Sequence, residues 1–277
     1  MVVPVHKNSD SKVKYSKDEL LVNVENVNLT YDKQILRDVN FQIHNITRPG
    51  VSQGQVISMI GRSGIGKTQL FKILAGLIRP NSGSVRIGLD QHIVEAGEVG
   101  IVSQNYILFN HRTVMENLRL AMKHSSITIN DKEKDALIQQ YAEKFDLAEH
   151  LKKYPTQLSG GQRQRTSIIQ QVLTGNKFIL LDEPFSGLDA LMIDLVMELL
   201  VQISLLDELN TLVIVSHDVE NSLAISDTAF ILAREKDKPG ATITETLDLI
   251  ELGMAWNPAI REDSAFQHLV SQIKHKI

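Results

Sequence analysis

The segment GRSGIGKT at positions 61–68 constrains the fold of this chain more than any other stretch of its sequence. It matches the P-loop pattern, in which glycines let backbone N–H groups curve around phosphate oxygens and a lysine reaches the outer phosphates. The apolar run Val56–Ile60 precedes the segment, and apolar residues recur at a helical spacing over Gln69–Ile78 after it. Because the pattern lies between a predicted strand and a predicted helix, it indicates a nucleoside-triphosphate site rather than an ordinary glycine turn.

Short apolar runs elsewhere in the chain predict the rest of an α/β fold. Leu20–Asn28 and Val39–Ile43 alternate well enough to indicate an antiparallel sheet at the start of the domain. A helical stretch follows the capping pattern of Asn130 and Glu133. Four further runs are typical of buried parallel strands: Gly100–Ser103, Phe178–Leu181, Leu212–Ser216 and Ala229–Ala233. The predicted fold is a P-loop core with a mostly parallel sheet, an N-terminal antiparallel β-subdomain and an inserted helical subdomain.

These patterns divide the chain into three parts. We expect a polar N-terminal tail over residues 1–18 and one domain over 19–234, with its helical subdomain at about 105–172. A short extension over 235–277 follows, which is too short to form another domain of ordinary size. Its last part, around Ala265–Ile273, has a helical pattern.

Composition and charge narrow the classes of function. A net charge of −4 gives no support to a duplex nucleic-acid partner, because such proteins carry a basic surface. The absence of cysteine excludes disulfides, thiolate nucleophiles and cysteine-ligated metals, and it agrees with a reducing compartment. No stretch approaches the roughly eighteen apolar residues of a spanning helix, and the first residues lack the apolar core of a signal peptide. We therefore expect a cytoplasmic chain whose membrane role would come from a partner.

Two acidic residues, Asp182 and Glu183, directly follow the predicted strand Phe178–Leu181. A triphosphate site needs a carboxylate for Mg²⁺ at the end of a neighbouring strand, and Asp182 stands at such a position. Glu183 is then placed to polarise a water molecule for in-line attack on the γ-phosphate. Taken alone, such a pair more often marks a solvated strand end, so this interpretation depends on the P-loop.

The string LSGGQRQR over Leu158–Arg165 adds a second anion-binding pattern. Ser159 offers a hydroxyl, Gly160 and Gly161 allow close backbone approach, and the following helix aims its N-terminal dipole at an anion. With the motifs above, this string makes the chain resemble ABC-type ATPases over roughly Leu20–Arg234. In that family this loop contributes to the nucleotide site of the opposite subunit, so the resemblance implies a head-to-tail dimer. The alternative is a capped helix start without a ligand.

The resemblance also implies roles for four single residues. Gln104 resembles the glutamine that touches Mg²⁺ and senses the γ-phosphate, and His217 resembles the switch histidine that hydrogen-bonds this phosphate. The alternative for His217 is a merely exposed histidine at a strand end. Asp189 in SGLDA resembles the contact to the other subunit's site, with a routine turn into a helix as the alternative. Tyr31 resembles the aromatic residue on which adenine stacks, with a buried tyrosine as the alternative.

The expected site residues form three groups, and the expected cofactors are ATP and Mg²⁺. The catalytic residues would be Glu183, His217 and Gln104, and the metal ligands Thr68, Gln104 and Asp182. ATP would be bound by Tyr31, by the P-loop residues Gly61, Arg62, Ser63, Gly64, Ile65, Gly66, Lys67 and Thr68, and across the dimer by Ser159, Gly160, Gly161, Gln162 and Asp189.

The resemblance implies an ATPase that dimerises on ATP and drives a membrane permease, most simply an importer of a small solute. The implied partners are a second copy, integral permease subunits and, indirectly, a solute-binding protein, but no nucleic acid. Such a subunit would be peripheral, on the cytoplasmic face of the inner membrane. The alternative, a soluble ABC ATPase of translation or DNA-repair type, usually has two ATPase domains or a long coiled coil, and this sequence has neither.

Several segments bear on a narrower assignment. The part after Ala233 resembles the short tails of nitrate, sulfonate or taurine-type importer ATPases. The segment Asn45–Gly54 is longer than the tight turn usual in the family, and Asn110 stands where such importers often have proline. We expect the permease to dock beside the helical subdomain on an exposed apolar cluster of Tyr106, Leu108 and Phe109; the alternative is that Leu108 and Phe109 pack inside.

Overall fold

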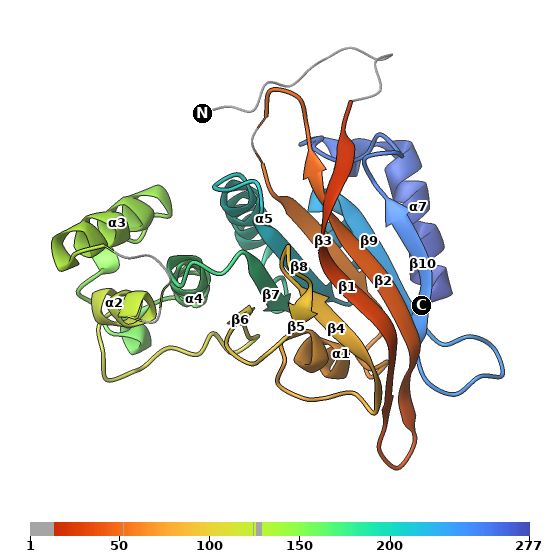
Figure 1. Ribbon diagram of the computed structural model, residues 1–277. Helices are drawn as coiled ribbons and strands as arrows, with labels where there is room; N and C mark the ends of the chain where they lie inside the picture. Colours follow the sequence, from red (N-terminus) through yellow and green to blue (C-terminus); the bar gives the residue numbers. More distant parts are fainter. Residues whose placement is uncertain (1–13, 52, 124, 126–128) are drawn as a thin grey trace.

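A computed structural model describes residues 14–51, 53–123, 125 and 129–277 of the chain. These residues form two sheets, with helices grouped on two sides of them (Figure 1). The predicted polar tail, 1–18, lies mostly outside the described residues, and the first strand begins at Ser16. The observed architecture confirms the predicted fold class: a P-loop core with a mostly parallel sheet, an antiparallel β-subdomain and an inserted helical subdomain.

The central sheet places the candidate site at the carboxyl ends of its parallel strands. Its order is β10 (Thr242–Asp248), β9 (Thr228–Ala233), β3 (Gln55–Ile60), β8 (Thr211–Ser216), β7 (Phe178–Asp182) and β6 (Gly100–Val102). All neighbours are parallel except β10, which pairs antiparallel with β9. The residues of β3, β8 and β9 are buried throughout, which explains their continuous apolar runs.

The second sheet is antiparallel and covers one face of the core. Its order is β2 (Gln34–Thr47), β1 (Ser16–Thr30), β4 (Ser82–Ile87) and β5 (His92–Ile93). Phe41 of β2 packs on Phe230 of β9 with ring centroids 4.6 Å apart, and this contact joins the two sheets through one hydrophobic cluster. Strands β1 and β2 are longer than the predicted apolar runs. Register shifts in their pairing interrupt the alternation of polar and apolar residues, so the sequence pattern did not reveal their full length.

The helices divide into three groups. The first, α1 (Lys67–Leu74), lies beside the central sheet directly after the P-loop. The second lies between β6 and β7 in the chain and forms a separate lobe at the far left of Figure 1: α2 (Val114–Lys123), α3 (Asp131–Lys144) and α4 (Gly160–Leu173), with short 3-10 turns η1 (Ala148–His150) and η2 (Pro155–Gln157). The third comprises α5 (Ala190–Ser204), α6 (Val219–Ile225), the 3-10 turn η3 (Ile260–Glu262) and α7 (Ser264–Lys276).

Two helix predictions show how local chemistry sets element ends. The capping pattern before α3 is confirmed, since Asn130 accepts a hydrogen bond from Glu133 N–H and the Glu133 carboxylate accepts one from Asn130 N–H. The helix predicted over Gln69–Ile78 begins earlier, at Lys67, and ends at Leu74. It ends there because Gly76 takes a left-handed conformation, with φ 68°, that stops the helix.

The first residues of the segment Asn45–Gly54 extend β2. Strand β2 continues to Thr47, and the guanidinium of Arg48 lies 3.8 Å from the ring centroid of Trp256. At the end of the segment, a Cβ on Gly54 would lie only 2.0 Å from the Asn210 carbonyl oxygen, so only glycine fits there. The two ends of the segment thus have different neighbours: Arg48 contacts Trp256 after β10, and Gly54 lies against Asn210 before β8.

Candidate nucleotide site

The P-loop lies between β3 and α1, as its pattern predicts. Gly64 and Gly66 have φ angles of 75° and 122°, which only glycine adopts without strain. Lys67 is the first residue of α1, and its buried ammonium donates hydrogen bonds to the carbonyl oxygens of Gly61, at 2.7 Å, and Arg62, at 3.2 Å. The turn is thus shaped as an anion cradle at the start of a helix, where the helix dipole favours negative charge.

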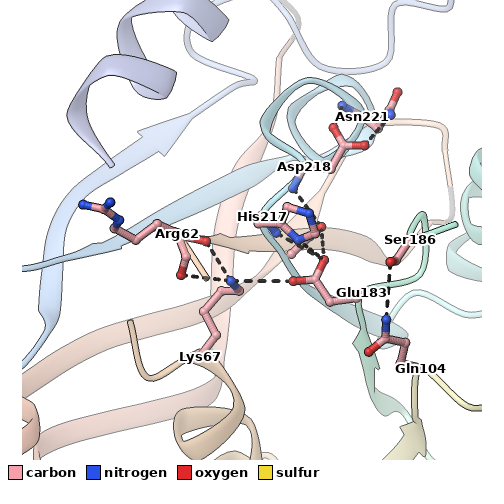
Figure 2. A network of polar contacts seen from close by, with 10 residues as sticks. Arg62, Lys67, Gln104, Glu183, Ser186, His217, Asp218 and Asn221 are labelled. Atoms are coloured by element: carbon pink, nitrogen blue, oxygen red, sulfur yellow. Dashed lines mark hydrogen bonds and ion pairs between the residues drawn. The ribbon is translucent and has the colours of Figure 1, made fainter. Parts of the chain in front are cut away.

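The Lys67 ammonium also faces Glu183, whose Oε1 lies 3.6 Å away (Figure 2). Burial lowers the pKa of Lys67, and the nearby Glu183 carboxylate works against that shift. The ion pair joins the start of α1 to the end of β7, two elements that are far apart in the sequence. It brings the predicted phosphate-binding lysine and the predicted general base together in one site.

Glu183 is held by the end of β8. Its Oε2 accepts hydrogen bonds from Ser216 Oγ–H at 2.8 Å and from His217 N–H at 3.2 Å, and His217 Nδ1 lies 2.9 Å from it (Figure 2). The backbone φ of Glu183 is 50°, a conformation that aims its side chain from the strand end into this group. Burial raises the pKa of Glu183, but the hydrogen bonds from His217 and Ser216 outweigh it, so the pKa is below its usual value.

The residues predicted to hold Mg²⁺ come from three elements. Asp182 is the last residue of β7, Gln104 follows the adjacent parallel strand β6, and Thr68 lies in the first turn of α1. Gln104 Nε2 donates to Ser186 Oγ at 3.3 Å. Hydroxyl, carboxylate and amide oxygens are the hard ligands that Mg²⁺ prefers, so the donor set fits the ion. Within the described ranges, no three His, Asp or Glu side chains cluster in a way that could hold a metal ion by themselves.

Tyr31 lies on the surface beside α1. Its side chain is 58% exposed, and its hydroxyl donates to Gln69 Oε1 at 3.2 Å. The alternative of a buried tyrosine is therefore wrong. An exposed ring next to the P-loop helix is free to stack on a flat ligand.

The LSGGQ string forms the start of α4. Ser159 is the cap residue: its Oγ accepts from Gln162 N–H, and Gln162 Oε1 accepts from Ser159 N–H. Gly160 is exposed, whereas Gly161 is buried, and a Cβ on Gly161 would lie 2.2 Å from Met192 Cε of α5. These two hydrogen bonds pair the N–H groups of Ser159 and Gln162 within the helix start. The terminus of α4 is nevertheless exposed at Ser159 and Gly160, where the helix dipole favours an anion.

Asp189 ends the SGLDA turn and caps α5, because its Oδ1 accepts a hydrogen bond from Met192 N–H at 3.0 Å. The turn does lead into a helix, and Asp189 is exposed, so its contact to the other subunit's site stays a prediction. Ser216 was not predicted as a site residue. A polar residue at the end of a fully apolar strand, directly before His217, was the available signal for it.

The apolar cluster predicted for docking is only partly exposed. Leu108 is buried at 9%, and Tyr106 is half-buried against the helical lobe, so the prediction is wrong for these side chains. Phe109 is 45% exposed, and its neighbour Ile107 is 75% exposed. The outward-facing pair after Gln104 is therefore Ile107 and Phe109, because Leu108 packs into the core.

Comparison with known proteins identifies the family. A family profile described as ABC transporter matches residues 44–186. The uncharacterized ABC transporter ATP-binding protein YtlC of Bacillus subtilis is 34% identical over 239 residues, which cover 86% of each chain. The chain belongs to the ABC transporter ATP-binding family. This family member also matches the spermidine/putrescine import ATP-binding protein PotA of Fusobacterium nucleatum, at 37% identity over 76% of the chain and 54% of PotA.

A solved structure supports the fold of this ABC ATP-binding protein. The dimeric structure of a bacterial ABC transporter cassette superposes with a TM-score of 0.66, covering 83% of this chain and 99% of that one at 23% identity. The chain spans about half or less of the first curated relatives that it matches. No described helix is both long and apolar enough to cross a membrane.

Proposed function

We propose that this chain is the ATP-binding and ATP-hydrolysing subunit of an ABC transporter that imports a small solute. The observation that carries the proposal is the Glu183 carboxylate, which faces the P-loop lysine at 3.6 Å while Ser216 and His217 hold its other oxygen. Its lowered pKa keeps this carboxylate ionised, and an ionised carboxylate fixed beside a phosphate cradle is placed to act as base toward an attacking water. Membership in the family and the import role in the name of PotA support the transport assignment.

The residues of this chain divide the chemistry among them. Lys67 and the N–H groups of the P-loop bind and neutralise the phosphates of the substrate, and the exposed Tyr31 stacks on its base. Thr68, Asp182 and Gln104 would hold Mg²⁺, which offsets negative charge on the phosphates when bound. Glu183 orients and deprotonates the attacking water, and His217 supports it from the end of β8.

Two copies of the chain complete the proposed site. Ser159, Gly160, Gly161 and Gln162 form a capped helix start, exposed at Ser159 and Gly160, that would contact the phosphates bound by the other copy. Asp189 would contact the other copy from the adjoining turn. Integral permease subunits are the proposed further partners, with a solute-binding protein indirectly, at the cytoplasmic face of the inner membrane. The nitrate, sulfonate or taurine class remains our proposal for the importer type.

The direct test is nucleotide binding and ATP turnover by the purified chain with Mg²⁺. We expect the wild-type chain to bind ATP and release phosphate, and Lys67→Ala to bind ATP more weakly, because the phosphate cradle loses the buried ammonium of the P-loop. A matched control is Lys72→Ala, in the same helix but in its last turn. A wild-type chain that binds no ATP would overturn the proposal.

A further inference from the structure

Arg261 connects the C-terminal extension to two helices that adjoin the candidate site. It lies in the 3-10 turn η3, where Nη1 donates to Asp194 Oδ1 of α5 at 2.7 Å and Nη2 donates to Asn221 Oδ1 of α6 at 2.6 Å. Helix α5 begins at the Asp189 cap, and α6 begins directly after the His217 turn. A single guanidinium thus joins the starting regions of both helices.

A chain of hydrogen bonds continues from Asn221 to Glu183 (Figure 2). Asn221 Nδ2 donates to Asp218 Oδ2 at 2.6 Å, and the main-chain N–H of Asp218 donates to Ser216 Oγ at 3.1 Å. Ser216 Oγ in turn donates to Glu183 Oε2 at 2.8 Å. Together with the bond from Arg261, every link in this chain donates in the direction of Glu183.

The chemistry of the partners fixes each link in one orientation. A guanidinium only donates and a carboxylate only accepts, so Asn221 must turn its oxygen to Arg261 and its NH₂ group to Asp218. Ser216 has a single hydroxyl proton, and because its oxygen accepts from Asp218 N–H, the proton is directed to Glu183. Arg261 therefore selects the amide orientation on which the remaining links depend.

Burial makes this chain stronger than an exposed one. Ser216 is fully buried, and Asp218 and Asn221 are half-buried. Hydrogen bonds in such surroundings are electrostatically stronger than in water, and bonds that point the same way polarise one another. At Asp218 the carboxylate accepts one hydrogen bond and the main-chain N–H donates the next. The two bonds are joined only through the residue's covalent structure, so Asp218 passes on a change in position and not a change in charge.

From these contacts we infer that Arg261 is a positioning residue for Glu183, acting through Asn221, Asp218 and Ser216. The inference rests on the proposed function, because it gives a role to the base of that reaction. It assigns the C-terminal extension a part in ATP turnover, although Arg261 touches neither the P-loop nor Glu183. Loss of the guanidinium lets Asn221 turn and loosens the His217 turn, and kcat then falls while nucleotide binding persists.

A purely structural role for Arg261 is the competing account, and the structure supplies the contacts to test it. The extension is also held to α6 by an ion pair of Lys274 with Glu220 at 3.6 Å, outside the hydrogen-bond chain. The Arg261–Asp194 pair likewise holds the extension to α5 without a link to Glu183. Lys274→Met and Asp194→Asn are therefore matched controls that weaken docking of the extension and leave the chain of hydrogen bonds in place.

The test is a double-mutant cycle in ATP turnover with Arg261→Met and Asn221→Leu, measured alongside wild type and Glu183→Gln. Arg261→Met keeps an unbranched side chain without the guanidinium, and Asn221→Leu keeps the branching at Cγ and the main-chain N–H that donates to Asp218 Oδ1. We expect each single variant to lower kcat roughly tenfold with little change in KM, because a misplaced catalytic group can cost up to about 10²-fold. The double variant should be no slower than the slower single variant, because both break one chain.

The outcomes separate this inference from the function on which it rests. Losses that multiply in the double variant, a wild-type kcat in Arg261→Met, or an equal loss in Lys274→Met would each overturn the positioning role. If Arg261→Met lowers the melting temperature too far for assay, Asn221→Leu against Asp194→Asn decides, since only the former breaks the chain. If Glu183→Gln turned over ATP as fast as the wild-type chain, the proposed function would be contradicted, and the inference with it.

Discussion

Two adjacent carboxyl groups, Asp182 and Glu183, have opposite environments at the end of β7. Burial and the neighbouring Glu183 charge raise the pKa of Asp182. For Glu183, burial is outweighed by hydrogen bonds from His217 and Ser216, which lower its pKa. Environments that separate two carboxyl groups in this way are how a site gives them different tasks. In the proposed function, Asp182 is the metal ligand and Glu183 the general base.

The prediction at this residue is that Glu183→Gln retains ATP binding and loses turnover. Glutamine has the same shape but cannot take a proton, and general-base groups contribute about 10²–10⁴-fold to rate. Steady-state phosphate release, with nucleotide binding measured in parallel, checks the separation. Turnover near that of wild type in this variant would contradict the assignment of the base.

Asp227 is a second titratable residue with an unusual environment, far from the P-loop in sequence. Its side chain is buried at the start of β9, and Oδ2 accepts a hydrogen bond from Val56 N–H at 2.7 Å. Burial raises its pKa to about 7, although that hydrogen bond and the positive charge of Arg48 oppose the shift. The folded protein therefore keeps this carboxyl protonated at a pH where the unfolded chain has ionised it.

The sign of the pH dependence follows from this raised pKa. The stability that Asp227 contributes is fully present below its unfolded pKa and is lost as pH rises through about 7. We expect Asp227→Asn, which keeps an oxygen for Val56 N–H, to reduce this loss. Above neutral pH, the Tm of this variant should be higher than that of the wild-type chain by about a few degrees. Thermal melting of both proteins between about pH 5 and 8 checks it. Parallel Tm curves for the two proteins would contradict the prediction.

Among the elements, we propose that the segment after β6 provides the surface on which a permease docks. Ile107 and Phe109 face outward, while Leu108 anchors the segment in the core. Gln104, three residues before Ile107, contacts Ser186, so movement of this segment is linked to the candidate site.

We expect Ile107→Ser with Phe109→Ser to abolish co-purification with the permease and transport while ATP turnover of the isolated chain persists. Exposed apolar side chains contribute to binding a partner and little to folding. Leu252→Ser, which changes a 51% exposed leucine in the extension, is the matched control. Normal transport by the double variant would place the docking surface elsewhere.

Elements could be predicted from the sequence where all their residues are buried or where a motif marks one of their ends. Strands β3, β7, β8 and β9 are buried on both faces, so their apolar runs were visible, and the α3 cap was correctly predicted. Strand β10 was not predicted, because only Leu247 of its residues is buried. As an edge strand paired on one side, it has no strong pattern.

The candidate site shows the same limit. Positions 61–68, Asp182 and Glu183 were singled out because short motifs mark them, and His217 because of the family resemblance; the structure brings Lys67 and His217 into contact with Glu183. The link from Arg261 to Asn221 spans 40 residues and carries no motif. Contacts of that kind depend on how α6 and the extension pack, which single-sequence patterns do not encode.

At the scale of the whole molecule, the P-loop side and the α4 start belong to different parts of the chain. The P-loop, Glu183 and His217 follow the carboxyl ends of strands in the central sheet. Ser159 instead lies at the start of α4 in the helical lobe (Figure 1). The capping hydrogen bonds of Ser159 are local, and its helix terminus is exposed. A second copy, arranged head to tail, would bring the missing half to each site.

The most direct test of a nucleotide site shared by two copies is the mass of the Glu183→Gln variant in solution. Light scattering would measure this mass with and without Mg²⁺ and ATP. This variant should bind ATP without consuming it, so the nucleotide stays between the P-loop of one copy and Ser159 of the other. We predict that the mass doubles with ATP and stays that of a single chain with ADP, and that Ser159→Ala together with Glu183→Gln weakens the doubling. A mass indifferent to nucleotide would contradict a site built from two copies.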